Sequence, residues 1–325
     1  MNYTIVATLG PGSATEAAWK AMLSAGATGF RLNTSHLSLE QLQVWLDRIR
    51  AFLSALDSDH PLVLDLQGSK WRLGQFTPFE LVTGQRIELH YADSTGRQNA
   101  LPVPHADFFQ AATVSNGEIA LNDAKVRLHV ESIGPDALRA TVTQGGEISP
   151  SKGITLACSE YRREALSEKD QAILEETAGA GFIRYAISYV KDAGEMARYR
   201  ELAGPSTYLI AKLERRPAID EAVQIAGYAD ELWLCRGDLG AELGLQAMAE
   251  AVHRFSALPG SLSIPLLMAG QVLEYMTVHP TPTRSEVCYL YTALIAGYAG
   301  FVLSDETATG RYPVESCRNA ALFKD

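Results

Sequence analysis

The feature of this chain that most restricts its fold is a regular alternation of short apolar runs and helical segments. Eight runs rich in β-forming residues begin near Thr4, Ala27, Pro61, Gly181, Thr207, Asp230, Ile264 and Ala299. Most are flanked by helix-like stretches, such as 39–56, 168–180 and 192–203. Near-continuous apolar runs at a spacing of roughly 23 to 35 residues are typical of parallel strands buried on both faces. The pattern predicts an α/β protein, a (β/α)8 TIM barrel built from repeated β-loop-α units.

One long gap, between the third and fourth runs, interrupts this alternation. Residues 77–156 carry short strand-like pieces separated by Gly, Pro, Asn and Asp turns, and a short helical piece at 106–112. The strand-like pieces lie at 86–90, 125–133 and 137–142. We expect a small β-barrel domain inserted after the third strand that acts as a lid, with a decorative insertion as the alternative. The catalytic barrel then comprises 1–76 and 157–325.

Composition excludes several classes of function. Of the 325 residues, 47% are hydrophobic and 20% are charged, as in ordinary soluble proteins. No apolar run approaches the roughly 20 residues that span a membrane, and the chain opens directly into an apolar run without a signal peptide. A formal net charge of −10 argues against a nucleic-acid surface. Four cysteines without CxxC spacing indicate neither a zinc site nor disulfides, so we expect a cytoplasmic protein without membrane or nucleic-acid partners.

Three charged residues at two strand ends are the first candidates for chemistry. Lys212 and Glu214 lie two apart at the end of one apolar run, so on a strand their side chains share a face. Asp238 ends the next apolar run, one repeat further on. Because successive strand ends lie side by side in a parallel barrel, we expect the three to converge on one spot. Two carboxylates beside an ammonium suit a divalent metal that bridges to an anionic substrate. A surface Lys–Glu pair is the alternative.

Other strand ends are polar on the same side of the predicted barrel. Arg31, Asn33 and Ser35 alternate after the second run, so an extended segment turns all three to one side. A guanidinium suits a phosphate and neutral oxygens suit a hard cation, whereas a plain polar turn is the alternative. After the third run come Asp65, Lys70 and Arg72. Barrel stability requires apolar layers, so polar residues at so many strand ends indicate an active site.

Short motifs occur in a fixed order along essentially the whole chain. They are Ala7-Thr-Leu-Gly-Pro11, Arg31-Leu-Asn-Thr-Ser-His36, Leu64-Asp65 with Gly68 and Arg72, Ser151-Lys152-Gly153, Leu166-Ser-Glu-Lys-Asp170, Ala211-Lys-Leu-Glu214, Arg236-Gly-Asp-Leu-Gly-Ala-Glu242, Pro282-Thr-Arg-Ser-Glu286, Leu303-Ser-Asp-Glu-Thr-Ala308 and Tyr312-Pro-Val-Glu315. In these motifs the chain resembles the pyruvate kinase family. The resemblance implies a (β/α)8 barrel with a β-domain inserted after the third strand.

The resemblance also implies roles for the charged residues. Glu214 and Asp238 match the ligands of a catalytic Mg²⁺ or Mn²⁺. Lys212 matches the cation that neutralises the phosphoryl group in flight, and Arg31 matches a residue that holds the same group. Such roles suit a loose transition state stabilised mainly by electrostatics. The positions on the nucleotide side are Asn33, His36, Arg72, Lys152 and, in the lid domain, Asp123.

The substrate-carboxylate site shows a departure from the family. Arg236, with the backbone of Gly237 and Asp238, matches the residues that receive this carboxylate. Gly270 stands where the family has a threonine whose hydroxyl binds the same group. Losing that hydrogen bond to an anion costs about 1.5–3 kcal/mol. It also opens space for a bulkier 2-oxo acid or enol.

A second departure concerns the monovalent cation. Asn33, Ser35 and Asp65, with the carbonyl of Leu66, match the family's K⁺ site. Most members read Thr-Lys-Gly-Pro-Glu where this chain reads Leu-Gln-Gly-Ser-Lys at 66–70. The ammonium of Lys70 in place of that glutamate supplies the positive charge that K⁺ otherwise brings, as in the K⁺-independent branch. We therefore expect no K⁺ requirement, with a solvent-facing Lys70 as the alternative.

Two last differences concern the end of the chain. Asp305 stands where the usual motif has Gly, which adds negative charge near the nucleotide side. The sequence stops after the eighth helix begins, so we expect the family's C-terminal domain, where many members bind effectors, to be absent. One subunit interface is lost with it, which leaves a homodimer through the barrel as the expected assembly.

Three functions fit these residues. The first is transfer of a phosphoryl group from phosphoenolpyruvate to ADP, the glycolytic reaction of pyruvate kinase. The second is a metal-dependent lyase or decarboxylase acting on a larger 2-oxo acid, favoured by Gly270 and Asp305. The third is a non-catalytic sensor that binds metal and an enol phosphate. Intact Lys212, Glu214 and Asp238 argue against the sensor, because a pseudoenzyme is free to lose them.

Overall fold

The chain folds into two compact units. The computed structural model describes residues 1–57, 59–112, 117–122, 124–156, 166–257, 260 and 262–325. The first unit comprises Met1–Gln67, Glu168–Arg236 and Glu250–Asp325, and the second comprises Gly68–Ser167 and Gly237–Ala249. The predicted insertion, 77–156, falls within the second unit, and its boundaries stay a prediction.

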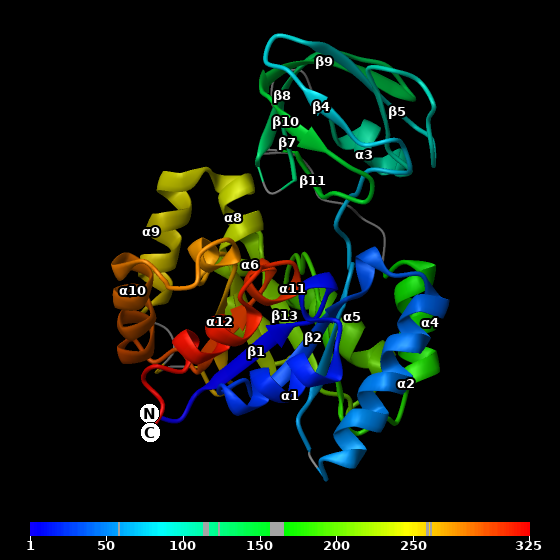
Figure 1. The fold of residues 1–325 in the computed structure, drawn as a ribbon. Helices are drawn as coiled ribbons and strands as arrows, with labels where there is room; N and C mark the ends of the chain where they lie inside the picture. Colours follow the sequence, from blue (N-terminus) through cyan, green and yellow to red (C-terminus); the bar gives the residue numbers. More distant parts are fainter. Residues whose placement is uncertain (58, 113–116, 123, 157–165, 258–259, 261) are drawn as a thin grey trace. The chain divides into compact units, whose positions relative to one another are not determined.

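Eight parallel strands close into a barrel in the first unit (Figure 1). Their order around the barrel is β1 (Thr4–Thr8), β16 (Gly300–Leu303), β15 (Leu266–Ala269), β14 (Glu231–Cys235), β13 (Leu209–Leu213), β12 (Ile183–Ile187), β3 (Leu62–Leu66) and β2 (Gly29–Asn33). Every residue of β3, β13, β14, β15 and β16 is buried, because both faces of the sheet are covered. The predicted (β/α)8 TIM barrel is confirmed.

Helices lie outside the strands of this barrel (Figure 1). They are α1 (Glu16–Ser24), α2 (Leu39–Ala55), α4 (Glu168–Thr177), α5 (Ala193–Ala203), α6 (Arg216–Asp220), α7 (Ala222–Ile225), α10 (Arg284–Ile295), α11 (Asp305–Ala308) and α12 (Pro313–Ala320). Two more, α8 (Arg236–Leu243) and α9 (Leu245–Phe255), are shared between the units. Ser38 and Gln41 form the capping box that begins α2, which the sequence predicted at 39–56. Within the described ranges, each helix is too short or too polar to span a bilayer.

Strand register explains why polar residues gather at one end of the barrel. Five of the residues that pack together in the interior are Val63, Ala186, Ile210, Trp233 and Ala269. The bulky indole has small alanines in the same cluster, as close packing requires. Side chains on one strand face repeat every second residue. The next inward positions along or just past β3, β12 and β13 are therefore Asp65, Ser188 and Lys212.

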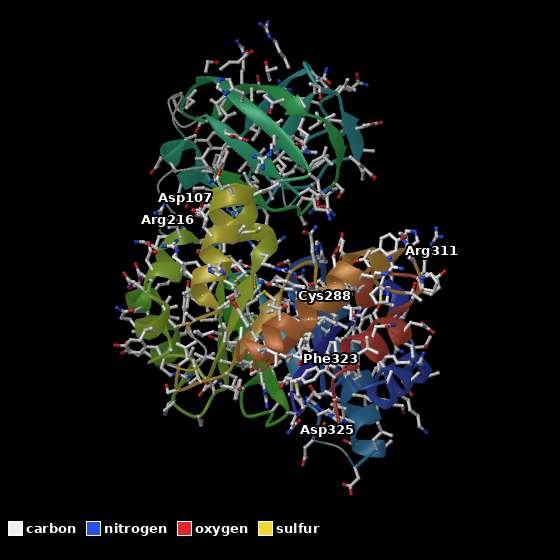
Figure 2. All side chains as sticks on the ribbon, turned by 90° about the vertical axis from the view of Figure 1, so that its left-hand side faces the viewer. Asp107, Arg216, Cys288, Arg311, Phe323 and Asp325 are labelled. Carbon is white, nitrogen blue, oxygen red and sulfur yellow. The ribbon has the colours of Figure 1, made fainter. Side chains whose placement is uncertain are left out.

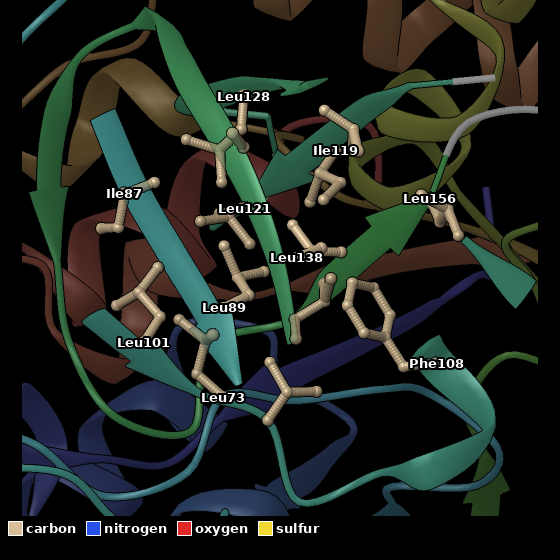
Figure 3. Packing of buried hydrophobic residues seen from close by; sticks show 14 of the residues in the cluster. Leu73, Ile87, Leu89, Leu101, Phe108, Ile119, Leu121, Leu128, Leu138 and Leu156 are labelled. Carbon is tan, nitrogen blue, oxygen red and sulfur yellow. The ribbon is translucent and has the colours of Figure 1, made fainter. Parts of the chain in front are cut away.

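The second unit has a hydrophobic core of its own. Its six-stranded sheet has the order β11 (Ile154–Leu156), β7 (Glu118–Leu121), β8 (Val126–Ile133), β9 (Ala137–Gln144), β5 (Arg86–His90) and β6 (Ala100–Pro102), and β10 (Gly146–Ile148) pairs with β4 (Phe79–Leu81). Inward residues such as Leu89, Leu128 and Leu138 pack with Phe108 of α3 (Ala106–Ala111) (Figure 3). The three strands and the short helix expected in this segment are present as β5, β8, β9 and α3.

The two ends of the chain lie side by side in the first unit (Figure 1). The Met1 amino group donates to Phe323 O at 3.0 Å and lies 2.8 Å from Asp325 Oδ2. Figure 2 shows Phe323 and Asp325 together at this end. The Tyr3 hydroxyl, just before β1, donates to Ala320 O in α12 at 2.8 Å. These bonds join the first strand to the last helix.

Candidate active site

Four charged side chains and a serine meet at the carboxyl ends of β2, β3, β12 and β13. Arg31 Nε donates to Asp65 Oδ2 at 2.7 Å, and Arg31 Nη2 lies 2.7 Å from the same oxygen. Lys212 Nζ lies 3.1 Å from Asp65 Oδ2 and 3.0 Å from Glu214 Oε1. Ser188 Oγ donates to Asp65 Oδ1 at 2.9 Å and accepts from Lys212 Nζ at 2.8 Å. These five residues form one continuous ionic network in the first unit.

The network is buried. Lys212 is 8% exposed and Glu214 is 2% exposed, so the alternative of a surface Lys–Glu pair is wrong. The expected proximity of Lys212 and Glu214 is confirmed. Asp65 is a further carboxylate beside Lys212. Asp238 belongs to the second unit, so its expected convergence with Lys212 and Glu214 stays a prediction.

Burial and pairing together set the charge states of the network. Burial alone would raise the pKa of Asp65, but the Lys212 ammonium and the Arg31 guanidinium hold it at about 2. Burial alone would lower the pKa of Lys212, but Asp65 and Glu214 outweigh it and the pKa is raised. Lys212 therefore remains an ammonium, and Asp65 a carboxylate, throughout the neutral range.

Neighbouring groups hold the network in place. Arg31 Nη1 donates to Thr8 Oγ1 at 2.8 Å, and the Thr8 hydroxyl donates in turn to Leu303 O at 2.7 Å. The backbone amide of Tyr189 donates to Glu214 Oε2 at 2.6 Å. Both carboxylate oxygens of Glu214 thus have defined directions, which is what a preorganised metal ligand requires.

Arg236 is held by the loop that follows β15. Its Nε and Nη2 donate to Gly270 O at 3.0 and 2.7 Å, and Nη2 also donates to Gln271 O at 2.8 Å. The guanidinium carbon lies 4.6 Å from the ring centroid of Tyr289. Gly270 has φ +79° and Gln271 has φ +53°, so both occupy the left-handed region. The backbone therefore gives a reason for glycine at 270 that is independent of substrate size.

Lys70 and Asp238 form an ion pair in the second unit, between Lys70 Nζ and Asp238 Oδ1. Lys70 is 6% exposed, so the alternative in which it faces solvent is wrong. Asp238 lies in the first turn of α8. Elsewhere in this unit Arg72 Nη1 donates to Ser151 O at 2.8 Å.

The positions matched to the K⁺ site lie together in the first unit, apart from Lys70. Asn33 and Asp65 are register partners on β2 and β3, and Leu66 follows Asp65. Asn33 Oδ1 accepts from Ser35 N at 3.2 Å. Ser35 Oγ is buried and has no hydrogen-bond partner within the described part of the chain. A buried hydroxyl in this state suits a cation ligand.

The nucleotide-side positions are divided between the units. Asn33 and the exposed His36 belong to the first unit, and Arg72 and Lys152 belong to the second. Asp123 lies outside the described residues. Asp305, which follows β16, is exposed in the first turn of α11. Nucleotide binding by this set stays a prediction.

Comparison with known proteins agrees with this geometry. The family description "Pyruvate kinase, barrel domain" matches residues 1–317. The chain belongs to the pyruvate kinase family. Pyruvate kinase of Methylorubrum extorquens is 34% identical over 314 residues, which cover 96% of this chain and 66% of that protein. Pyruvate kinases of Agrobacterium vitis (32% over 315 residues, covering 96% and 66%) and Aeropyrum pernix (31% over 317 residues, covering 96% and 68%) are also similar. The chain spans about two thirds of the length of these relatives.

Pyruvate kinases generally use a divalent metal, and the carboxylates of this chain suit one. Glu214 and Asp238 offer hard oxygen donors, which Mg²⁺ and Mn²⁺ prefer. In the described ranges no three His, Cys, Asp or Glu side chains cluster as a metal cage. Mg²⁺ is usually held by one or two carboxylates plus water and substrate oxygens. The pairing of Glu214 and Asp238 on one ion stays a prediction, since they belong to different units.

Sequence reasoning missed several groups that shape this pyruvate kinase-like site. Ser188 lies just past β12, the fourth barrel strand. It comes two residues after the inward Ala186, and this spacing could have predicted that its side chain faces the site. Thr8 lies within a matched motif but had no assigned role. The Tyr189 amide is a backbone donor, and its side-chain type carries no information about that bond.

Proposed function

We propose that this chain is a phosphotransferase of the pyruvate kinase type, which converts phosphoenolpyruvate and ADP to pyruvate and ATP. The observation that carries the proposal is the buried Lys212 ammonium, held by Asp65, Glu214 and Ser188 at the carboxyl end of the barrel. A fixed cation in a water-poor site stabilises charge that develops on a phosphoryl group in transfer. The similarity to curated pyruvate kinases supports the same reaction.

In this reaction the P–O bond to the enol oxygen breaks and a bond to the terminal phosphate oxygen of ADP forms. Lys212 and Arg31 would stabilise the charge on the transferred group, and Asp65 would hold both cations in position. The enolate that remains takes a proton at its methylene carbon. A divalent cation bound by Glu214 and Asp238 would supply Lewis-acid stabilisation of phosphoryl and enolate oxygens. Arg236, Gly237 and the Asp238 amide would bind the substrate carboxylate.

We also propose that turnover does not require K⁺. Lys70 is a buried cation of the chain itself. It replaces the glutamate that most family members have at this position beside the K⁺ site. The orphaned Ser35 hydroxyl argues the other way, since it suits a bound cation. Turnover rates measured with and without K⁺ distinguish a K⁺-independent enzyme from one that requires K⁺.

The lyase alternative loses part of its support. It depended on reading Gly270 as a widened substrate pocket. The positive φ of Gly270 and the bonds from Arg236 to its carbonyl explain a glycine there without a larger substrate. Phosphoryl transfer is therefore the function that the site supports best.

The test is release of pyruvate from phosphoenolpyruvate with Mg²⁺, measured with and without ADP and with and without K⁺. We expect ADP-dependent turnover at similar rates with and without K⁺. Replacing Lys212 with methionine should lower kcat by roughly a thousandfold, since a preorganised charge facing the transition state is removed.

Lys20→Met on the exposed face of α1 is the matched control and should keep full activity. Folded, Mg²⁺-loaded protein that releases no pyruvate would rule out the kinase. Turnover of a 2-oxo acid without ADP would favour the lyase instead.

A further inference from the structure

The Asp238 carboxylate of the second unit has two possible cationic partners, the Lys70 ammonium and the proposed divalent metal. The Asp238 side chain is 14% exposed and the Lys70 side chain is 7% exposed, so neither end of their ion pair is well solvated. Their pairing links α8 to the segment that follows β3. Opposite charges in so little solvent stabilise each other, so removing Lys70 from Asp238 has an energetic cost.

The neighbouring backbone is shaped around the end of the Lys70 side chain. A Cβ at Gly153 would lie 2.4 Å from Lys70 Cε and 2.8 Å from Lys70 Nζ. Gly153 pairs with Arg72 in a short antiparallel bridge, and Ile154 N donates to Trp71 O at 2.9 Å, so this backbone is fixed beside Lys70. A side chain at 153 would push the ammonium from its place. Glycine at this position therefore keeps room for the ion pair.

The same carboxylate is the proposed metal ligand. A divalent ion on Asp238 would experience repulsion from an ammonium held on the neighbouring lone pair of the same group. Like charges a few ångströms apart repel more strongly in a poorly solvated site than in bulk water. Full ligation by Asp238 therefore requires the ammonium to withdraw.

We propose that Lys70 is a tethered competitor for the divalent metal at Asp238, seated there by the space that Gly153 provides. The ammonium neutralises Asp238 when no metal is bound, and it leaves the carboxylate when the metal arrives. The chain thus weakens its own affinity for free metal, and metal binding releases a buried cation. This inference rests on the proposed role of Asp238 as a metal ligand.

The test measures Mn²⁺ binding to the purified chain without substrates, by electron paramagnetic resonance of free Mn²⁺. Lys70→Met keeps the length of the side chain and removes the charge, so it should tighten binding roughly tenfold. Gly153→Ala should act in the same direction but less strongly, because the methyl group meets the flexible end of Lys70. Lys125→Met removes an exposed charge from the same unit and should leave Mn²⁺ affinity unchanged.

A double variant tests whether the gain passes through Asp238. Adding Asp238→Asn to Lys70→Met should abolish the tighter binding. Lys70→Met protein that binds Mn²⁺ no better than the native chain, or that does not bind it at all, overturns the proposal. So does a gain in affinity that survives Asp238→Asn. Circular dichroism of each variant verifies folding.

A second readout follows Lys70 itself. Acetic anhydride modifies free amines, and mass spectrometry of the digest reports the extent at each lysine. Saturating Mg²⁺ should increase modification of Lys70 several-fold and leave Lys125 unchanged; equal modification with and without Mg²⁺ would contradict release.

These measurements do not depend on turnover. Tighter Mn²⁺ binding through Asp238 in a chain that releases no pyruvate would uphold the competition and reject the kinase reaction. Turnover by the native chain, together with unchanged Mn²⁺ affinity in Lys70→Met, would reject the competition and uphold the kinase reaction.

Discussion

At the scale of single residues, Asp65 is the acceptor on which the ionic network of the barrel converges. Arg31 and Lys212 contact its carboxylate, and the Ser188 hydroxyl completes the set. Removing one member of a buried ion pair leaves the partner's charge uncompensated, at a cost of roughly 3–5 kcal/mol. Asp65 therefore contributes to stability as well as to the position of Lys212.

The depressed pKa of Asp65 predicts how this contribution varies with pH. Its pKa falls from 3.8 to about 2 on folding, so the stabilisation is fully present above the unfolded value and is lost as pH falls toward 2. A shift of this size corresponds to about 2–3 kcal/mol. Urea unfolding should therefore show a large stability gap between native chain and Asp65→Asn near neutral pH, narrowing from about pH 4 downward.

Asp47→Asn, on the exposed face of α2, is the control. Its free energy of unfolding should differ little from that of the native chain at any pH. A gap between native chain and Asp65→Asn that stays constant down to about pH 3 would contradict this account of the network.

The same residues show what could be predicted from sequence. The two-residue spacing of Lys212 and Glu214 was enough to place them on one face, because strand periodicity is a local property. The pairing of Lys212 with Asp65 depends on strand order, since β12 lies between β3 and β13 in the closed barrel. Order around a barrel arises from long-range closure, which local patterns do not encode. Ser188 was not identified from the sequence, because a single serine is common in any loop and its contact with Asp65 also depends on strand order.

At the scale of elements, one buried carboxylate links the loops after β15 and β16 by accepting hydrogen bonds from both. Glu306 is fully buried, and its oxygens accept from Leu273 N at 2.9 Å and Ser304 N at 2.6 Å. Burial raises the pKa of Glu306, and the backbone donors only partly offset it. The loop after β15 in turn supplies the carbonyls that hold Arg236. The position of Arg236 therefore depends on the conformation of a neighbouring loop.

This dependence predicts the result of restoring the family's threonine. Gly270→Thr places a β-branched residue at φ +79° and should lower the free energy of unfolding by about 1–3 kcal/mol. Gly270→Ala should cost less, because alanine tolerates the left-handed region better. Urea unfolding of both variants measures the difference.

Gly181→Thr is the control, since Gly181 has no positive φ and a Cβ added there would meet open space. Gly270→Thr protein as stable as the native chain would mean that the loop does not need its left-handed conformation. The widened-pocket interpretation of Gly270 would then regain its support.

At the scale of the whole molecule, the chain contains two separate hydrophobic cores. Trp233 and its neighbours fill the barrel, and Leu128 and its neighbours fill the second unit. The alternation of apolar runs predicted the barrel, and the change to short strands and turns at 77–156 predicted a different fold there. Sequence did not indicate that Gly237–Ala249 belongs to the second unit. Amphipathic periodicity shows that a helix has a buried face, but not which core receives it.

Separate cores predict separate responses to a cavity. Leu128→Ala should destabilise the second unit by about 2–5 kcal/mol, because it removes a fully buried side chain of β8. Hydrogen exchange should accelerate in the strands β4 to β11 and remain slow in the barrel strands. Leu267→Ala in the barrel interior should give the opposite pattern. Equal acceleration in both units after either substitution would show a single cooperative molecule.

The distribution of indole rings gives the chain a built-in optical label for each unit. Of its four tryptophans, Trp71 alone lies in the second unit, where its ring meets Phe108 edge-on at 5.4 Å between centroids. Trp233 sits in the barrel interior, with its indole N–H donating to Glu231 at 2.5 Å. A chain that keeps Trp71 and replaces the other three would emit from the second unit alone. Its fluorescence would then report changes around Trp71 in the second unit, which contains the predicted lid domain, without any attached dye.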